Sequence, residues 1–250
     1  MFLNNSDIRN DSFVTDIVIQ DYRTSFVFRK YGIDYCCGGK LPLQMVCETR
    51  GLDTELIKKE LKETLRTIQV SSSTNFNNWS VDFLVDYIIN VHHTYLINNF
   101  PDIVDTVERF VEGHKSKYPY LTDLRESLVT LRDELLPHLE KEEKIIFPYI
   151  KQIAHAYERH EPYAALLVRT LRKPVENMMD HVYEQIVKSL HQVRHLTNNY
   201  TPASNACISH KVAFFKLKEL DNDLVQHIHL ERNILFPRAI AMEKEMLSLK

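Results

Sequence analysis

Glycine is scarce in this chain of 250 residues, and its distribution is uneven. Four of the five glycines lie within the first 51 residues, and only Gly113 follows them. Extended runs with period-two alternation are absent as well, so nothing in the sequence favours a β-sheet. We therefore expect an all-α protein with two regions of different construction, a small N-terminal helical domain followed by a longer helical bundle.

The chain also has few cysteines, no excess of basic charge and no long apolar run. Four cysteines are too few for a disulfide framework, and a net charge of −3 leaves no basic footprint for nucleic acid. No segment offers about 18 uncharged apolar residues in a row, so no membrane span is expected. The first residues lack the basic and then apolar order of a secretion signal, which predicts a cytoplasmic protein.

A polar, turn-forming run separates the two regions. We expect a small helical domain over residues 1–70, a linker over 71–79 and the bundle over 80–250. Ser80 is a plausible N-cap for the first bundle helix, and Pro101 is expected to end it. Apolar residues at three- and four-residue spacing predict bundle helices over residues 80–101, 101–117, 121–153, 163–196 and 207–247.

Two segments of the bundle repeat one pattern, H-x-x-x-E-x-x-I-[IL]-F-P. The first copy begins at His138 and the second at His227, 89 residues further on. Residues four apart share a helix face, so each copy presents a histidine together with Glu142 or Glu231 to one point. A single pair of this kind is more often a solvated contact. Two copies, each followed by the same apolar anchor, instead predict a metal site.

The type of pair narrows the class of metal protein. Ferritin-like di-iron centres use Glu-x-x-His, and zincin proteases use His-Glu-x-x-His. Neither pattern occurs in the chain. The predicted site is therefore rich in histidine and lies on facing helices of a bundle.

The second region resembles a hemerythrin-type antiparallel four-helix bundle. The whole chain resembles the iron–sulfur cluster repair di-iron proteins, the repair-of-iron-centres family, from the tract at residues 28–40 to the segment at 233–239. The resemblance implies a centre of two iron ions with an oxo or hydroxo bridge. The ligands that it implies are His93, His114, His138, Glu142, His181, His227 and Glu231.

Periodicity alone does not choose between His92 and His93, which are adjacent, and only the resemblance selects His93. Glu140 and Glu143 are displaced around the helix from the His138 face, so they are expected to be surface charges. The other histidines are expected to be solvated or to point away from the site: His155, His160, His191, His195, His210 and His229.

The implied ligands leave room for a small molecule. Two iron ions that each take about six ligands need about twelve donor positions. Five histidines, two bridging carboxylates and a bridging oxygen supply all but about one of these positions. Nitric oxide or dioxygen is the expected occupant of the remaining position.

The first region carries a second chemistry in the tract Cys36-Cys37-Gly38-Gly39. Pro42 indicates a helix start shortly after this tract, and a helix N-terminus lowers the pKa of a nearby thiol. We expect functional thiols at Cys36 and Cys37, although a buried pair packed as small hydrophobes is the alternative. Cys47 and Cys207 have no such setting and are expected to be structural.

Two classes of function remain open at this point. The resemblance implies repair of iron–sulfur clusters damaged by oxidative or nitrosative stress, by a homodimer that donates iron to damaged iron–sulfur proteins. The alternative is an enzyme or carrier that reduces nitric oxide or binds dioxygen. A pure carrier would need no domain with paired cysteines, so the sequence favours repair.

Overall fold

The structure is a computed structural model that describes residues 8–21, 23–35, 41–65, 75–171 and 182–248. Within these ranges every named element is helical and none is a strand. The prediction of an all-α fold is thus confirmed. The chain divides into two compact units, residues 1–72 with 200–216 and residues 73–199 with 217–250. The division after residue 72 falls inside the predicted linker, whereas residues 200–216 had been expected within the bundle.

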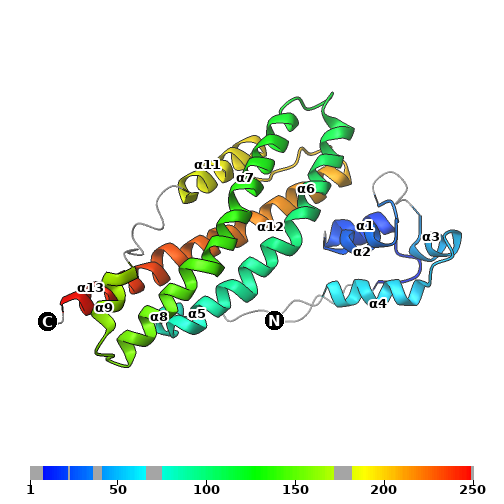
Figure 1. Cartoon of the computed structure of the whole chain (residues 1–250). Helices are drawn as coiled ribbons and strands as arrows, with labels where there is room; N and C mark the ends of the chain where they lie inside the picture. Colours follow the sequence, from blue (N-terminus) through cyan, green and yellow to red (C-terminus); the bar gives the residue numbers. More distant parts are fainter. Residues whose placement is uncertain (1–7, 22, 36–40, 66–74, 172–181, 249–250) are drawn as a thin grey trace. The chain divides into compact units, whose positions relative to one another are not determined.

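The described residues between 8 and 65 of the first unit form four short helices (Figure 1). Their apolar faces form one core, in which Phe28 and Leu43 are fully buried and Val212, from the segment 200–216, also packs. The side chain of Asp53 caps the fourth helix by accepting hydrogen bonds from two backbone N–H groups. The four helices are α1 (Val14–Gln20), α2 (Thr24–Lys30), α3 (Leu43–Thr49) and α4 (Thr54–Thr64). The helix start predicted near Pro42 is confirmed by α3.

The second unit is built from long helical stretches whose middle parts run side by side (Figure 1). Helix α7 packs against both α6 and α11, and α13 packs against α8 and α9. A short 3₁₀ turn, η1 (Phe76–Asn78), precedes them. The stretches are α5 (Val81–Tyr87), η2 (Ile88–His93) and α6 (Thr94–His114); α7 (Leu121–Lys141), η3 (Glu142–Ile146) and α8 (Phe147–Glu158); α9 (Ala164–Leu171) and α11 (Val182–Leu196); and α12 (Ile208–Leu230), η4 (Glu231–Leu235) and α13 (Phe236–Ser248).

The N-cap predicted at Ser80 is confirmed, but the helix end predicted at Pro101 is wrong. Ser80 accepts a hydrogen bond from the backbone N–H of Phe83 at 3.3 Å, as an N-cap does. Pro101, in contrast, lies inside α6, so the two helices expected on either side of it are one. Proline removes one backbone hydrogen bond, whereas burying a large apolar side chain stabilises by about 1.5–3 kcal/mol. Phe100 and Ile103 on either side are both buried, and their packing outweighs the lost bond.

Three wide π-helical turns, η2, η3 and η4, interrupt the long helices. In η3 the N–H of Phe147 donates to the carbonyl of Glu142, five residues earlier, and in η4 the N–H of Phe236 donates to Glu231 in the same way. A proline follows each phenylalanine, and since proline has no N–H the wide register cannot continue past it. Wide turns of this kind are frequent at functional sites.

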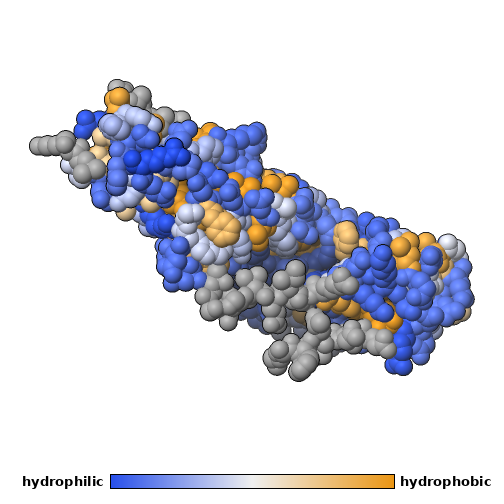
Figure 2. Space-filling model, turned by 90° about the horizontal axis from the view of Figure 1, so that it is seen from below, coloured by the Kyte–Doolittle hydropathy of each residue, from blue (hydrophilic) through white to orange (hydrophobic). Residues whose placement is uncertain are grey.

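Figure 2 shows one face on which hydrophilic side chains prevail and apolar ones form separate small patches. Among the described helices, none combines the length and the apolar character that a bilayer crossing requires.

Candidate metal centre

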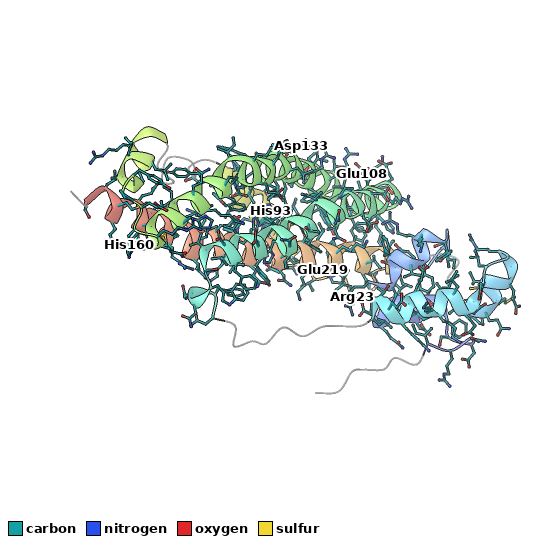
Figure 3. The ribbon with its side chains drawn as sticks, turned by 60° about the horizontal axis from the view of Figure 1, so that its bottom comes forward. Arg23, His93, Glu108, Asp133, His160 and Glu219 are labelled. Carbon is teal, nitrogen blue, oxygen red and sulfur yellow. The ribbon has the colours of Figure 1, made fainter. Side chains whose placement is uncertain are left out.

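Four of the predicted ligands meet inside the second unit, and three of them lie on the wide turns. His93, Glu142, His227 and Glu231 each offer one donor atom, and the four atoms all lie within 4.8 Å of one another. All four side chains are at most 1% exposed, and Figure 3 shows His93 between the ribbons of the bundle. Buried carboxylates are costly unless they are paired or bind a cation, so this cluster is a strong candidate for a metal site.

The two repeated His-x-x-x-Glu pairs have the geometry that their spacing predicts. Nε2 of His138 lies 3.0 Å from Oε1 of Glu142, and Nε2 of His227 lies 2.8 Å from Oε1 of Glu231. Both pairs are buried, so they are not the solvated contacts that such spacing gives on a helix surface.

The donor atoms form two sets, and the first set surrounds the facing nitrogens of His93 and His227. Nε2 of His93 lies 3.1 Å from Nε2 of His227. The same His93 atom lies 3.6 Å from Oε2 of Glu142 and 3.7 Å from Oε1 of Glu231. Two nitrogens and one oxygen from each carboxylate therefore surround one point.

The remaining carboxylate oxygens belong to a second donor set. Oε1 of Glu142 faces His138 and lies 2.7 Å from the hydroxyl oxygen of Tyr183. Oε2 of Glu231 lies 2.9 Å from the same hydroxyl oxygen. Each carboxylate thus directs one oxygen to either set, which is the arrangement in which a carboxylate bridges two cations.

The spacing of these atoms fits metal coordination. Ligands at right angles on a cation with bonds of about 2.1 Å lie about 3 Å apart, and the 3.1 Å between the facing histidines matches this spacing. Within the described part of the chain, Nε2 of His138 and Oε2 of Glu142 are buried without a hydrogen-bond partner. An unsatisfied buried polar atom costs about 1–3 kcal/mol, and a cation in each set would satisfy both atoms.

Electrostatics in the cluster favour positive charge. Burial disfavours the imidazolium, but the neighbouring carboxylate of Glu231 outweighs it and raises the pKa of His227. Burial likewise disfavours the carboxylate, but His227 and His93 lower the pKa of Glu231. Burial and the two carboxylates raise the pKa of Tyr183. The surroundings therefore stabilise a cation next to Glu231.

The comparisons with known proteins agree with this geometry. Residues 84–239 match the family described as the hemerythrin HHE cation binding domain, and residues 10–65 match ScdA_N, a domain of unknown function (DUF542). A protein of Edwardsiella ictaluri (strain 93-146) named iron-sulfur cluster repair protein YtfE is 31% identical over 225 residues, which cover 90% of this chain and 95% of the relative. The chain belongs to this family of iron–sulfur cluster repair proteins.

Further relatives carry the same name. The protein of Enterobacter sp. (strain 638) is 31% identical over 231 residues, covering 91% of this chain and 96% of the relative. That of Escherichia coli O17:K52:H18 is 32% identical over 221 residues, covering 88% and 93%. The family match therefore spans both units of the chain rather than the bundle alone.

Residues next to the donor atoms hold the ligands in position. Glu143 is one of these residues, although the sequence predicted it to be a surface charge. Its carboxylate lies 2.9 Å from Nδ1 of His93, which fixes the ring with Nε2 toward the donors. The expectation that Glu143 is only a surface charge is wrong, because a carboxylate that lies off the His138 face can still meet a ligand from a neighbouring helix. Glu143 lies in η3 and His93 in η2, so their contact joins two helical stretches.

The structure separates the roles of the two adjacent histidines. His93 reaches the donor cluster, whereas Nδ1 of His92 lies 2.9 Å from a carboxylate oxygen of Asp223. The His92 ring also stacks on that of His227, with centroids 5.9 Å apart. His92 therefore helps to hold a ligand in place, and the only sequence signal for it was its position in an apolar stretch.

The structure does not bring His114 to the cluster. It is the last residue of α6, which continues without a break from the turn that carries His93. At 1.5 Å per residue the two histidines are about 30 Å apart along the helix. Nδ1 of His114 instead lies 2.9 Å from the carbonyl oxygen of Phe110. The resemblance implied His114 as a ligand, and in the structure the continuous helix α6 carries this residue away from the cluster.

Three predicted site residues, Cys36, Cys37 and His181, lie outside the described residues. Among the other histidines the expectation of exposure is wrong for His210, which is 2% exposed and packs its ring on Phe214. The exposed ones are His155, His160, His191, His195 and His229.

Cys47 lies in the core of the first unit. It is fully buried, and burial raises the pKa of its thiol. A protonated, enclosed thiol is inert, as a structural cysteine should be.

Proposed function

We propose that this chain holds two iron ions in its bundle and repairs iron–sulfur clusters damaged by oxidative or nitrosative stress. The observation that carries the proposal is the buried set of His93, Glu142, His227 and Glu231, whose carboxylates face two donor sets. The proposed process, cluster repair, rests on the relatives that are named for it and that match about nine-tenths of the chain.

Iron is the metal that we propose, with zinc and copper as the ions to exclude, because all three bind imidazole well. A mixed set of histidine nitrogens and carboxylate oxygens suits iron and leaves positions for a small ligand such as nitric oxide or dioxygen. Two ions in adjacent sets supply redox and Lewis-acid chemistry when bound. In repair, the iron itself is the cargo delivered to the damaged protein.

The thiols of Cys36 and Cys37 are proposed to engage the damaged protein or to accept electrons. This part rests on the Cys-Cys-Gly-Gly tract and on the helix α3 that begins at Leu43. We propose further that the protein acts in the cytoplasm as a homodimer.

Metal analysis is the first test. The purified protein should bind about two iron ions per chain, because two donor sets share two bridging carboxylates. Replacing Glu142 and Glu231 together by alanine should abolish iron binding, whereas replacing the exposed Glu140 should not. One zinc ion per chain, or full iron content in the double variant, contradicts the proposal.

A repair assay tests the process itself. The iron-loaded, reduced protein is incubated anaerobically with a cluster enzyme that nitric oxide has inactivated, with and without an iron chelator. Recovered activity that the chelator suppresses is the expected result. Catalytic consumption of nitric oxide with no recovered activity would favour the alternative of a nitric oxide reductase.

Iron binding and cluster repair should be separable by mutation. Replacing Cys36 and Cys37 by serine should leave the iron content unchanged and sharply reduce the recovery of the damaged enzyme. Replacing His227 by alanine should reduce both, because an imidazole is lost from the donor set. Equal repair by the double cysteine variant would show that the thiols are structural.

A further inference from the structure

Tyr183 is a member of the second donor set that the sequence analysis did not single out. Its hydroxyl oxygen lies 2.7 Å from Oε1 of Glu142 and 2.9 Å from Oε2 of Glu231. The side chain is 2% exposed. The two oxygens that it contacts are those that face away from the set of His93 and His227.

These contacts are not explained by hydrogen bonding alone. A phenol has one proton, so Tyr183 can donate to only one of the two carboxylates at a time. Nε2 of His138 lies 3.0 Å from the same oxygen of Glu142, yet it makes no hydrogen bond there within the described residues. Three oxygens and one nitrogen therefore converge with fewer protons than contacts, which is how the ligands of a cation are arranged.

We infer that Tyr183 supplies an oxygen ligand to the second iron ion of the centre. The inference rests on the proposed di-iron function and adds a ligand to it, in a place for which the sequence offered only His181. When iron binds, the phenol proton is released to solvent and the oxygen coordinates the metal, as other protein ligands do.

The surroundings of the ring fix its position without involving the hydroxyl. The Tyr183 ring packs edge-on against His138, with centroids 4.8 Å apart, and against Phe236 at 6.3 Å. The guanidinium of Arg232 lies 5.5 Å from the ring centre. Replacing Tyr183 by phenylalanine therefore keeps the packing and removes only the oxygen.

The test uses the full chain loaded with ferrous iron and then oxidised in air. Iron per chain, visible absorption and resonance Raman spectra are recorded for the parent protein and for Tyr183→Phe. The parent should bind two iron ions and show a phenolate-to-iron charge-transfer band with enhanced phenolate ring vibrations. The variant should lose both spectral features, and its second iron should be removed by a chelator at least about tenfold faster.

Tyr149→Phe is the matched control. Tyr149 is another buried tyrosine of the second unit that donates to a buried glutamate, Glu243, but it belongs to neither donor set. Its replacement should leave the iron content and both spectral features unchanged. Circular dichroism of each variant checks that the helices are retained.

The outcomes separate the inference from the proposed function. If the parent protein takes up no iron, the di-iron proposal fails. If it takes up two iron ions but shows no phenolate vibrations, or if Tyr183→Phe keeps the parent spectrum, only the role of Tyr183 is overturned. The spectrum of the parent protein decides the point even if the variant does not fold.

Discussion

At the scale of single residues, the centre depends on side chains that hold the ligands as well as on the ligands. Nδ1 of His93 bonds to Glu143, and this contact leaves Nε2 directed at the donor set. A histidine whose second nitrogen is fixed in this way presents its lone pair in one orientation. His92, held by Asp223 and stacked on His227, contributes in a similar way to another ligand.

Glu143→Ala should weaken iron binding without abolishing it. The loss of the hydrogen bond frees the His93 ring, and a loss of this type costs about 10- to 100-fold in metal affinity. Competition with a chelator of known affinity measures the change. Glu140→Ala is the control, because Glu140 lies in the same stretch of chain, is exposed and pairs with the exposed Lys144. Equal affinity of the two variants would show that Glu143 does not support the centre.

A partly buried ion pair links the helices α11 and α12. Arg194 makes two hydrogen bonds to Asp221, of 2.8 and 2.6 Å, and the Asp221 side chain is 8% exposed. Arg194→Ala leaves this carboxylate with less compensation and should lower the free energy of unfolding by about 2 kcal/mol, less than for a fully buried pair because solvent reaches the arginine. Chemical denaturation measures the change. Arg109→Ala, which removes an exposed pair with Asp105, should cost about 0.5 kcal/mol or less. Similar losses for both variants would contradict the prediction.

At the scale of elements, the wide turns set the angle between the ligands and the apolar anchors that follow them. Glu142 and Glu231 each begin such a turn, and a buried Phe residue follows it. A π turn holds one residue more than an α turn, so the phenylalanine five residues after each glutamate returns to nearly the same face, whereas a regular α-helix would turn it about 140° away. The repeated pattern therefore places both a carboxylate and a phenylalanine inside the bundle.

Deleting Asn233 tests this role of η4. The shorter stretch should become a regular helix in which Phe236, then four residues after Glu231, keeps nearly the same face, because five residues of a π turn and four residues of an α turn each complete about one turn. The iron content should therefore be retained, and the melting temperature should change little. The substitution Asn233→Ala keeps the number of residues and should change neither, since Asn233 is exposed. A deletion variant that loses its iron would show that the centre needs the wide turn itself and not only the face on which Phe236 lies.

At the scale of the whole molecule, the two compact units do not correspond to two continuous parts of the sequence. The start of α12 belongs with the first unit, where Val212 is 1% exposed and Ile208 packs against the same core. The rest of α12 carries His227 and belongs to the second unit. A boundary drawn in the linker alone therefore leaves an apolar segment without its partners.

A fragment of residues 78–250 should keep its iron but associate with itself. The four gathered donors and Tyr183 all belong to the second unit, whereas Val212 and Ile208 lose the core that covers them. Exposed apolar patches of this kind promote association. Size-exclusion chromatography together with metal analysis measures both properties. Val212→Ser in the fragment should reduce the association, whereas Val225→Ser, at a position 49% exposed in the full chain, should not. A fragment that binds no iron would show that the centre needs the first unit.

The sequence by itself determined the helical class, the N-cap at Ser80 and the two His-x-x-x-Glu pairs. These features are local, because helix periodicity, capping and four-residue spacing depend only on neighbours along the chain. Periodicity and spacing did not identify the metal ligands outside the two His-x-x-x-Glu pairs. Adjacent histidines differ by about 100° around a helix, so both lie near an apolar face and periodicity does not distinguish them.

The tertiary structure alone decided which side chains converge. Helix α6 continues through Pro101 because the apolar residues around it are buried, and this continuous helix places His114 about 30 Å along its axis from His93. The packing of η2 against η3 brings Glu143 to His93, and the packing of α11 brings Tyr183 to both carboxylates. These outcomes depend on contacts between residues far apart in the chain, and no spacing within one helix encodes the distance between two helices.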